Sequence, residues 1–182
     1  MPNPKIQAKF FEIIRESGIR PARALEIGGY LNHNSLLIAP ELEATERYCL
    51  NLMRMRADTP MKAVVGNSND MHMFDDESFD LVVSNATFEH DKYFWLSLAE
   101  IRRVTRAGGM VIIGVPGYTK NAKRVGARGT ITFAVHYRFD YYRFSEQAVR
   151  DVFFEGMDDV QVLSMLRPPR IIGHGRKPAR LS

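Results

Sequence analysis

The sequence predicts an α/β fold built on a doubly wound sheet. Two observations support this prediction. Segments with apolar residues at helical spacing alternate along the chain with short apolar runs typical of buried strands. The first of these runs, residues 24–27, leads directly into Gly28 and Gly29, where the chain must turn sharply. A strand that ends in a glycine turn is typical of such sheets.

The N-terminal half is expected to hold one clear helix and four strands. The helix presents Ile6, Phe10, Ile13 and Ile14 on one face, and Gly18 can end it. Residues 35–45 are weakly helical, although Pro40 interrupts them. The strands are predicted at residues 24–27, 48–52, 63–66 and 79–83.

The C-terminal half begins with the clearest helix, residues 93–106. Its apolar residues follow helical spacing, and the pair Gly108 and Gly109 is expected to close it before a strand at residues 110–115. Ser145 can cap a further helix that ends at Gly156, with an apolar face of Val149, Val152 and Phe153. Two closing strands are predicted at residues 160–166 and 170–173. Residues 117–139 show no period, and a loop of this length is usually functional or mobile.

The bulk composition indicates one soluble globular domain spanning residues 1–182. The chain is 45% hydrophobic and 25% charged, which is ordinary for such a protein. It has no apolar run of membrane-spanning length and no basic-then-apolar leader at its N-terminus, so we expect a cytoplasmic protein without membrane contact. The lone Cys49 allows no internal disulfide, and no His/Cys cluster indicates a metal site.

The formal net charge of +4 is a mild basic bias. Such a bias favours anionic partners, but binding of nucleic acid requires a localised patch. Two stretches are locally basic, and we interpret them first as a solvated loop and a solvated tail. They contain Lys120, Lys123, Arg124 and Arg128, then Arg167, Arg170, Arg176, Lys177 and Arg180.

Several motifs in order give the sequence a family resemblance. Glu26-Ile27-Gly28-Gly29 comes first, and an acid with glycines at a strand end suits nucleoside binding. Residues 75–84, Phe88-Glu89-His90, residues 99–104 and residues 107–112 follow. In this order the motifs resemble the class I S-adenosylmethionine-dependent methyltransferases of the type 11 group. The resemblance is good over residues 24–116 and weak over residues 141–178.

This resemblance implies a three-layer fold with a mostly parallel seven-stranded sheet and an antiparallel closing strand. It also implies S-adenosylmethionine as cofactor. Glu26, Gly28 and Gly29 would lie against its methionine part. Asn51 takes the position of the acid that binds the ribose, and Asn67 that of the acid at the adenine amino group. The Ser68 backbone would lie beside the adenine, and Asn85 would face the methyl group and the acceptor.

The cofactor motifs depart from the family pattern. Tyr30 and Asn32 replace glycines of the first motif, and both ligand-binding acids are asparagines. An amide oxygen still accepts a hydrogen bond, but the bond loses its charge-assisted part. These departures motivate a second hypothesis, in which the chain is a catalytically inactive binding module that retains the fold.

His90 is the candidate catalytic residue. Methyl transfer from a sulfonium is an in-line displacement that depends on positioning, and a hydroxyl acceptor benefits from a nearby base. His90 follows the fourth predicted strand, and Glu89 could orient it. The alternative is that both residues cap or pack under the next helix. His136 is a second candidate, and an aromatic group could line the acceptor pocket or pack on the sheet edge: Tyr137, Phe139, Tyr141, Tyr142 and Phe144.

The leading hypothesis is methyl transfer to an oxygen or nitrogen of a small molecule, with a sugar or secondary metabolite as first candidate. It rests on family analogy. An RNA methyltransferase is a further alternative, although residues 84–87 do not form the N-P-P-Y type motif of nucleic-acid enzymes. NAD binding is disfavoured because G-x-G-x-x-G is missing. A short chain leaves little room for a lid, so a second subunit of a homo-oligomer could complete the site.

Overall fold

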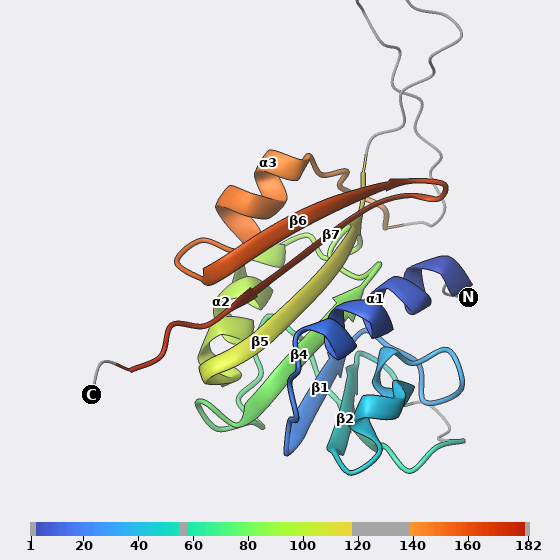
Figure 1. Cartoon of the computed structure of the whole chain (residues 1–182), viewed down its shortest axis with the longest axis vertical. Coiled ribbons are helices and arrows are strands. Elements are labelled where there is room, and N and C mark those ends of the chain that lie inside the picture. The colour runs from blue at the N-terminus through green and yellow to red at the C-terminus, as the bar shows by residue number, and fades with distance from the viewer. Residues whose placement is uncertain (1–2, 55–57, 118–138, 181–182) are drawn as a thin grey trace, which may run out of the picture.

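The computed structural model describes residues 3–54, 58–117 and 139–180, which form a seven-stranded sheet with helices on both faces (Figure 1). The strands are Arg23–Ile27 (β1), Glu46–Asn51 (β2), Lys62–Val65 (β3), Phe79–Asn85 (β4), Thr105–Pro116 (β5), Asp158–Leu166 (β6) and Pro169–Arg176 (β7). Their order in the sheet is β3-β2-β1-β4-β5-β7-β6. β7 runs antiparallel to β5 and β6, and the first five strands are parallel. The predicted fold class is confirmed.

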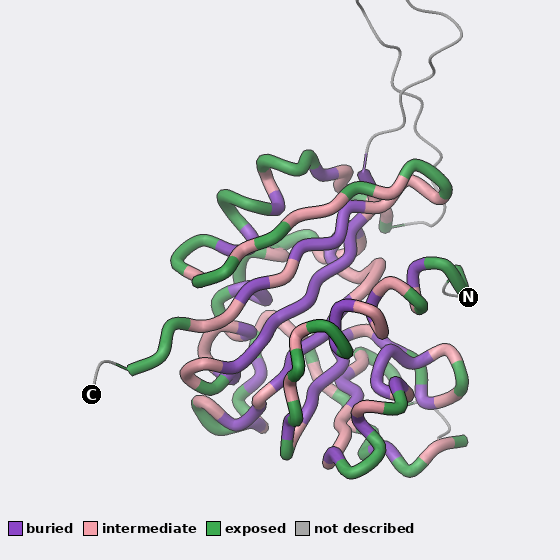
Figure 2. The backbone as a smooth tube through the Cα atoms, in the orientation of Figure 1, coloured by how far each residue is buried: buried purple, intermediate pink, exposed green. Residues whose placement is uncertain are grey.

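Alternate residues of the central strands face two separate hydrophobic clusters. Leu25, Ile27 and Val82 belong to one cluster, whereas Ala24 and Leu81 belong to the other. This alternation follows from the two-residue period of a strand and means that both faces of the sheet are covered. Figure 2 shows the buried backbone running along the middle of the sheet, whereas the outer strand β6 is largely exposed.

The first helix, α1 (Pro4–Glu16), covers one face of the sheet. Its start is capped by Asn3, whose side chain accepts a hydrogen bond from the backbone N–H of Lys5 at 3.0 Å. The four residues predicted to form its apolar face are all buried: Ile6, Phe10, Ile13 and Ile14. Gly18 follows the helix with a φ of +66°, as expected for a residue that ends a helix.

The second helix, α2 (Phe94–Val104), packs on the opposite face through Leu98, Ile101 and Val104. It ends before the predicted boundary because Thr105 is extended, and β5 begins there. Gly108 therefore does not close the helix. It lies within β5 with a φ of +75°, a left-handed conformation that glycine adopts without strain.

The last helical segment joins α3 (Glu146–Ala148) to the π-helical turn η4 (Val149–Phe153). Ser145 caps it as predicted, since its side chain accepts a hydrogen bond from the Ala148 N–H at 3.0 Å. Val149 and Phe153 are buried, but Val152 is 45% exposed, so the predicted apolar face was wrong at this position. A π turn has more residues per turn than an α-helix, which rotates Val152 away from the sheet.

The segment between β1 and β2 forms two short 3-10 turns in place of a helix. They are η1 (Leu36–Ile38) and η2 (Pro40–Leu42). Pro40 opens the second turn, where its missing N–H costs no hydrogen bond, and it separates the two turns. The weak helical pattern of residues 35–45 is thus realised only as separate turns.

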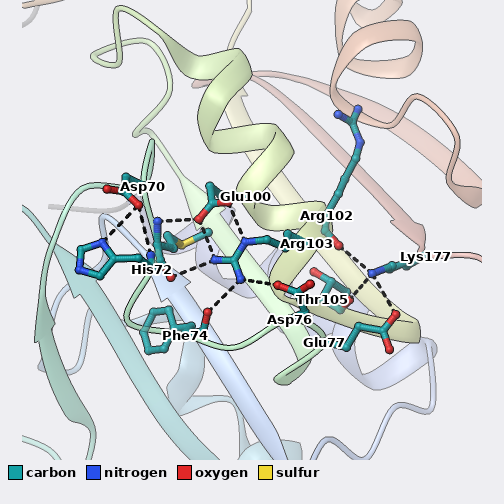
Figure 3. A network of polar contacts seen from close by, with 11 residues as sticks. Asp70, His72, Phe74, Asp76, Glu77, Glu100, Arg102, Arg103, Thr105 and Lys177 are labelled. Atoms are coloured by element: carbon teal, nitrogen blue, oxygen red, sulfur yellow. Dashed lines mark hydrogen bonds and ion pairs between the residues drawn. The ribbon is translucent and has the colours of Figure 1, made fainter.

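The loop between β3 and β4 contains no helix and is fixed by Arg103 of α2 (Figure 3). The guanidinium donates to the carbonyls of Met71 at 3.0 Å and Phe74 at 2.9 Å, and to the Asp76 carboxylate at 2.7 Å. Glu100, one turn earlier, holds Arg103 Nε at 2.7 Å and also accepts from the Met71 N–H at 2.6 Å. Backbone groups of an irregular loop therefore find partners on one helix.

None of the helices in residues 3–54, 58–117 and 139–180 has the length and apolar character that crossing a bilayer requires. The longest helix, α1, has 13 residues and buries one face against the sheet.

Candidate functional site

A cavity of about 270 Å³ opens at the carboxyl ends of the first three strands. Its walls are formed by residues that follow β1, β2 and β3, by residues in the turn after β4, and by Tyr141. In the sheet, β1 lies between β2 and β4, so strands are added in opposite directions on its two sides. Ligands of doubly wound sheets bind outside the carboxyl ends of the strands at such a switch point.

Gly28 turns the chain at this cavity. Its φ is +71°, in the left-handed region that favours glycine. A Cβ atom here would lie 2.3 Å from the hydroxyl oxygen of Thr87, which donates to the Ile27 carbonyl at 3.2 Å. The Gly28 N–H donates to the Leu50 carbonyl at 2.9 Å. The close packing of β1, β2 and the turn after β4 therefore requires this glycine.

Glu26 is buried and does not line the cavity. Its carboxylate accepts hydrogen bonds from the Leu36 N–H at 3.1 Å and from the Ser35 hydroxyl. Burial raises the pKa of Glu26 to about 7, and these hydrogen bonds oppose the increase. A Cβ on Gly29 would lie 2.1 Å from Glu26 Cδ, so Gly29 makes room for the carboxyl group. Glu26 thus fixes the segment after β1 through hydrogen bonds and does not contact the cavity.

Asn51 and Asn67 line the cavity at the ends of β2 and β3. Asn51 Nδ2 donates to the Gly29 carbonyl at 3.2 Å. Asn67 Oδ1 accepts from the Asn69 N–H at 3.0 Å, which fixes the direction of the Asn67 amide. An amide oxygen has a second lone pair, so Asn67 can accept a further hydrogen bond from a ligand.

Ser68 also lines the cavity, and it belongs to a polar cluster that the sequence motifs did not reveal. The Ser68 hydroxyl lies 2.8 Å from that of the buried Ser97 of α2. Asn69 and Asp91 line the same wall, and Asn69 Nδ2 donates to Asp91 Oδ2 at 2.8 Å. The residues that make these contacts are more than 20 positions apart in the sequence. The packing of α2 against the segment after β3 brings them together, and the sequence motifs carry no information on that packing.

His90 lines the cavity, and its Nδ1 lies 3.1 Å from the Phe139 carbonyl oxygen. Glu89 is directed elsewhere, towards Arg170, whose Nη1 lies 3.5 Å from Glu89 Oε1. Burial raises the pKa of Glu89 and lowers that of Arg170. The Glu89 carbonyl accepts from the Tyr141 N–H at 2.7 Å, which brings the segment after residue 138 over the turn. Phe139 takes the orienting contact that we expected from Glu89.

Asn85 ends β4 but lies outside the cavity lining. A Cβ on Gly114 would lie 2.6 Å from Asn85 Oδ1 and 3.1 Å from the Phe10 ring, so the side chain is directed towards α1. Its amide oxygen is buried and has no hydrogen-bond partner. A buried amide oxygen without a partner is unusual in a folded protein.

Several predicted site residues lie outside the described ranges: His136, Tyr137, Lys120, Lys123, Arg124 and Arg128. Of the remaining aromatic group, Tyr141 lines the cavity, and Phe144 is buried in the core with the half-buried Tyr142 against it. Phe139 is exposed. The group is therefore divided between the cavity and the core. Within residues 3–54, 58–117 and 139–180, no cluster of three His, Cys, Asp or Glu side chains has the arrangement of a metal site.

Comparison with known proteins gives a family match and structural likenesses. A model of the methyltransferase domain family matches residues 37–113. A phosphoethanolamine N-methyltransferase 2 from Haemonchus contortus, in complex with phosphomonomethylethanolamine and S-adenosylhomocysteine, superposes with a TM-score of 0.69 at 16% identity. The superposition covers 94% of this chain and 52% of that protein, so this chain spans about half the length of that protein.

In two other superpositions, a larger share of the other protein's chain is covered. A putative methyltransferase from Haloferax volcanii, in complex with the activator Trm112, gives a TM-score of 0.67 at 17% identity, with 96% of this chain and 92% of that chain covered. A Burkholderia thailandensis 1,6-didemethyltoxoflavin-N1-methyltransferase gives 0.64 at 18% identity, with 94% and 78% covered. No curated protein matches the sequence. The strand order, the structural likenesses and the match over residues 37–113 agree with the class I methyltransferase fold that the sequence motifs predicted.

Proposed function

We propose that this chain binds S-adenosylmethionine in the cavity beside β1 and transfers its methyl group to an oxygen or nitrogen of a small molecule. One observation carries the proposal. Gly28, Asn51, Asn67 and Ser68, which the resemblance places around the cofactor, are separated in sequence but line one cavity. Structures of similar fold hold S-adenosylhomocysteine together with small acceptors, which supports the same use here.

The proposed orientation of the cofactor follows from the lining. Asn67 and Ser68 would face the adenine, Asn51 the ribose, and the Gly28 turn the methionine part. The reactive sulfonium would then lie near the end of β4, beside Thr87 and His90. The departing methyl group is already activated, so the chain's task is to hold the acceptor atom in line with it.

His90 would act as the base when the acceptor is a hydroxyl. Its Nδ1 faces the Phe139 carbonyl at 3.1 Å, which favours a proton on Nδ1 and leaves Nε2 as the basic nitrogen. An amine acceptor needs this base less, because its lone pair is available once it is neutral.

Isothermal titration with S-adenosylmethionine and S-adenosylhomocysteine tests the proposal. We expect saturable binding of both at one site, and a higher melting temperature with either ligand. Neither heat nor a thermal shift at millimolar ligand would overturn cofactor binding. A radiolabelled methyl group on a panel of amines, sugars and phenols would then identify the acceptor.

Loss of cofactor binding is the alternative that the replacement of two glycines by Tyr30 and Asn32 motivates. Tyr30 is 44% exposed, and Asn32, which replaces the next glycine, forms its own turn by accepting from the Asn34 N–H at 2.9 Å. Neither residue lines the cavity. A chain of this kind would retain the fold as a binding module, and the same titration decides between the two functions. An RNA acceptor stays a further alternative and would show as label transfer to RNA.

A further inference from the structure

The wall of the cavity at the end of β3 is tied to the start of α2 through one carboxylate. Asp91 accepts hydrogen bonds from the Tyr93 N–H at 2.9 Å and from Asn69 Nδ2 at 2.8 Å. The Ser97 hydroxyl lies 2.6 Å from Asp91 Oδ2. Two elements that are distant in sequence, residues 67–70 and 91–97, are thus joined at a single side chain.

The hydrogen bonds of Asn69 connect Asp91 to Asn67. Asn69 Nδ2 is held by Asp91 and also lies 2.8 Å from Ser97 Oγ and 3.3 Å from the Tyr93 carbonyl oxygen. Its backbone N–H donates to Asn67 Oδ1 at 3.0 Å. The side chain of Asn69 is therefore held in place, and its backbone N–H fixes the direction of the Asn67 amide oxygen.

The orientation of Asn67 has a chemical consequence for the ligand. Its oxygen keeps one lone pair for a further donor, so the wall recognises a group that donates, such as the 6-amino group of adenine. A 6-oxo purine has a carbonyl oxygen at this position, which would face the Asn67 amide oxygen without forming a hydrogen bond. Because Asn67 replaces an acid, this recognition lacks charge assistance and depends on the amide being correctly placed.

We infer that Asp91 is a positioning residue that sets the selectivity of the cavity for a 6-amino purine, acting through Asn69 and Asn67. This inference rests on the proposed function, since it assumes that the cavity takes the nucleoside of S-adenosylmethionine. Asp91 itself already accepts from three donors, so it acts on the wall more than on the ligand. The selectivity of the cavity for a nucleobase thus depends on Asp91, which follows β4, in addition to Asn51 and Asn67.

The substitution Asp91→Asn tests the inference. If the new amide keeps its oxygen towards the Tyr93 N–H, its NH2 group faces the NH2 group of Asn69, and two donors oppose each other. Asp76→Asn is the matched control, because Asp76 also ties a loop to α2, through Arg103 at 2.7 Å, but does not line the cavity. Ser97→Ala and Asn69→Ala remove the other members of the cluster.

Affinities for S-adenosylhomocysteine and S-inosylhomocysteine, measured by titration, give the selectivity of each variant. We expect the wild type to prefer the 6-amino ligand, and Asp91→Asn to reduce this preference by about tenfold, the equivalent of one hydrogen bond. The control keeps the wild-type ratio. If Asp91→Asn weakens both ligands equally, or changes neither, the positioning role is overturned.

Hydrogen exchange of the unliganded protein separates this inference from the proposed function. We expect Asp91→Asn to speed exchange at the Asn69 and Asp70 N–H groups, which donate to the side-chain and backbone oxygens of Asn67, and to leave α1 unchanged. A wild-type protein that binds neither ligand overturns the proposed function. Exchange that is equally slow in the variant and the wild type overturns the coupling through Asp91 whether or not a ligand binds.

Discussion

The carboxyl group of Glu26 accepts a hydrogen bond from the backbone N–H of Leu36, ten residues later, at 3.1 Å. Glu26 is buried together with Ser35, and burial raises its pKa to about 7 from the ordinary value of 4.5. The acid of the first motif thus has a structural task in the absence of any ligand. It orders the turn that, in the family pattern, passes beside the cofactor.

This pKa predicts how stability depends on pH. Between about pH 4.5 and 7 the unfolded chain has lost the Glu26 proton while the folded chain retains it, so the free energy of unfolding falls as pH rises through this window. Glu26→Gln imitates the protonated form and removes this dependence. We expect the variant to match the wild type near pH 4.5 and to be more stable at pH 8 by up to about 3 kcal/mol. Urea denaturation at four pH values measures it, and parallel curves for the two proteins would contradict it.

Gly28 is expected to tolerate no side chain. In Gly28→Ala the new methyl group meets Thr87 at 2.3 Å and also forces an alanine into a φ of +71°. Gly156→Ala is the matched control, since Gly156 has a φ of +70° and no atom within 4 Å of its Cβ position. The control should lose about 1 kcal/mol of stability from backbone strain alone. Gly28→Ala should lose more and should weaken S-adenosylhomocysteine binding at least tenfold, and unchanged binding would mean that the cofactor lies elsewhere.

Arg103 is predicted to stabilise the loop between β3 and β4. Arg103→Met removes the Arg103 donors to the Phe74 and Met71 carbonyls, of which the Met71 carbonyl still accepts from the Phe74 N–H at 2.9 Å. A buried carbonyl that loses its donor is costly, so we expect a loss of about 2 kcal/mol. Arg106→Met is the control, because Arg106 is half exposed and pairs with Asp80 at the surface. It should cost less than about 1 kcal/mol. Equal losses in thermal denaturation would show that the loop does not depend on Arg103.

The sequence predicted the elements better than it predicted the site. The spacing of apolar residues located the buried face of α1, because a helix packed on a sheet has apolar residues at helical period. The glycine pair after α2 was assigned to the helix end and lies in β5, because glycines occur both at helix ends and at bends within strands. Five of the predicted site residues line the cavity, and their roles towards a cofactor stay predictions: Gly28, Asn51, Asn67, Ser68 and His90. Asn69, Asp91 and Ser97 were missed because their hydrogen bonds depend on how α2 lies against the loop after β3. Glu26, Gly29 and Asn85 occupy the expected strand ends, but their side-chain positions face the protein.

The Glu89–Arg170 pair predicts a strong coupling between two residues 81 positions apart. Their side chains are 6% and 15% exposed, and Glu89 Oε2 has no hydrogen-bond partner. Arg170→Met leaves a buried carboxylate unpaired, which should cost about 3 kcal/mol at pH 8. The cost should shrink at pH 5, because burial has already raised the pKa of Glu89 and the variant can take up a proton there. Adding Glu89→Gln should restore most of the loss, and a double-mutant cycle without such recovery would contradict the pairing.

His90 is expected to contribute to catalysis according to the chemistry of the acceptor. His90→Gln keeps a polar side chain at the cavity, so binding of S-adenosylhomocysteine should change by less than about threefold. For a hydroxyl acceptor, loss of the base should lower kcat by about 10²-fold or more. For an amine acceptor that is neutral at the assay pH, the loss should be less than about tenfold. His72→Gln is the control, since His72 is exposed and pairs with Asp70 away from the cavity. If His90→Gln methylates a hydroxyl acceptor at the wild-type rate, His90 is excluded as the base. With an amine acceptor, a rate that decreases only when the pH is below the pKa of that amine would show that the neutral amine reacts through its own lone pair.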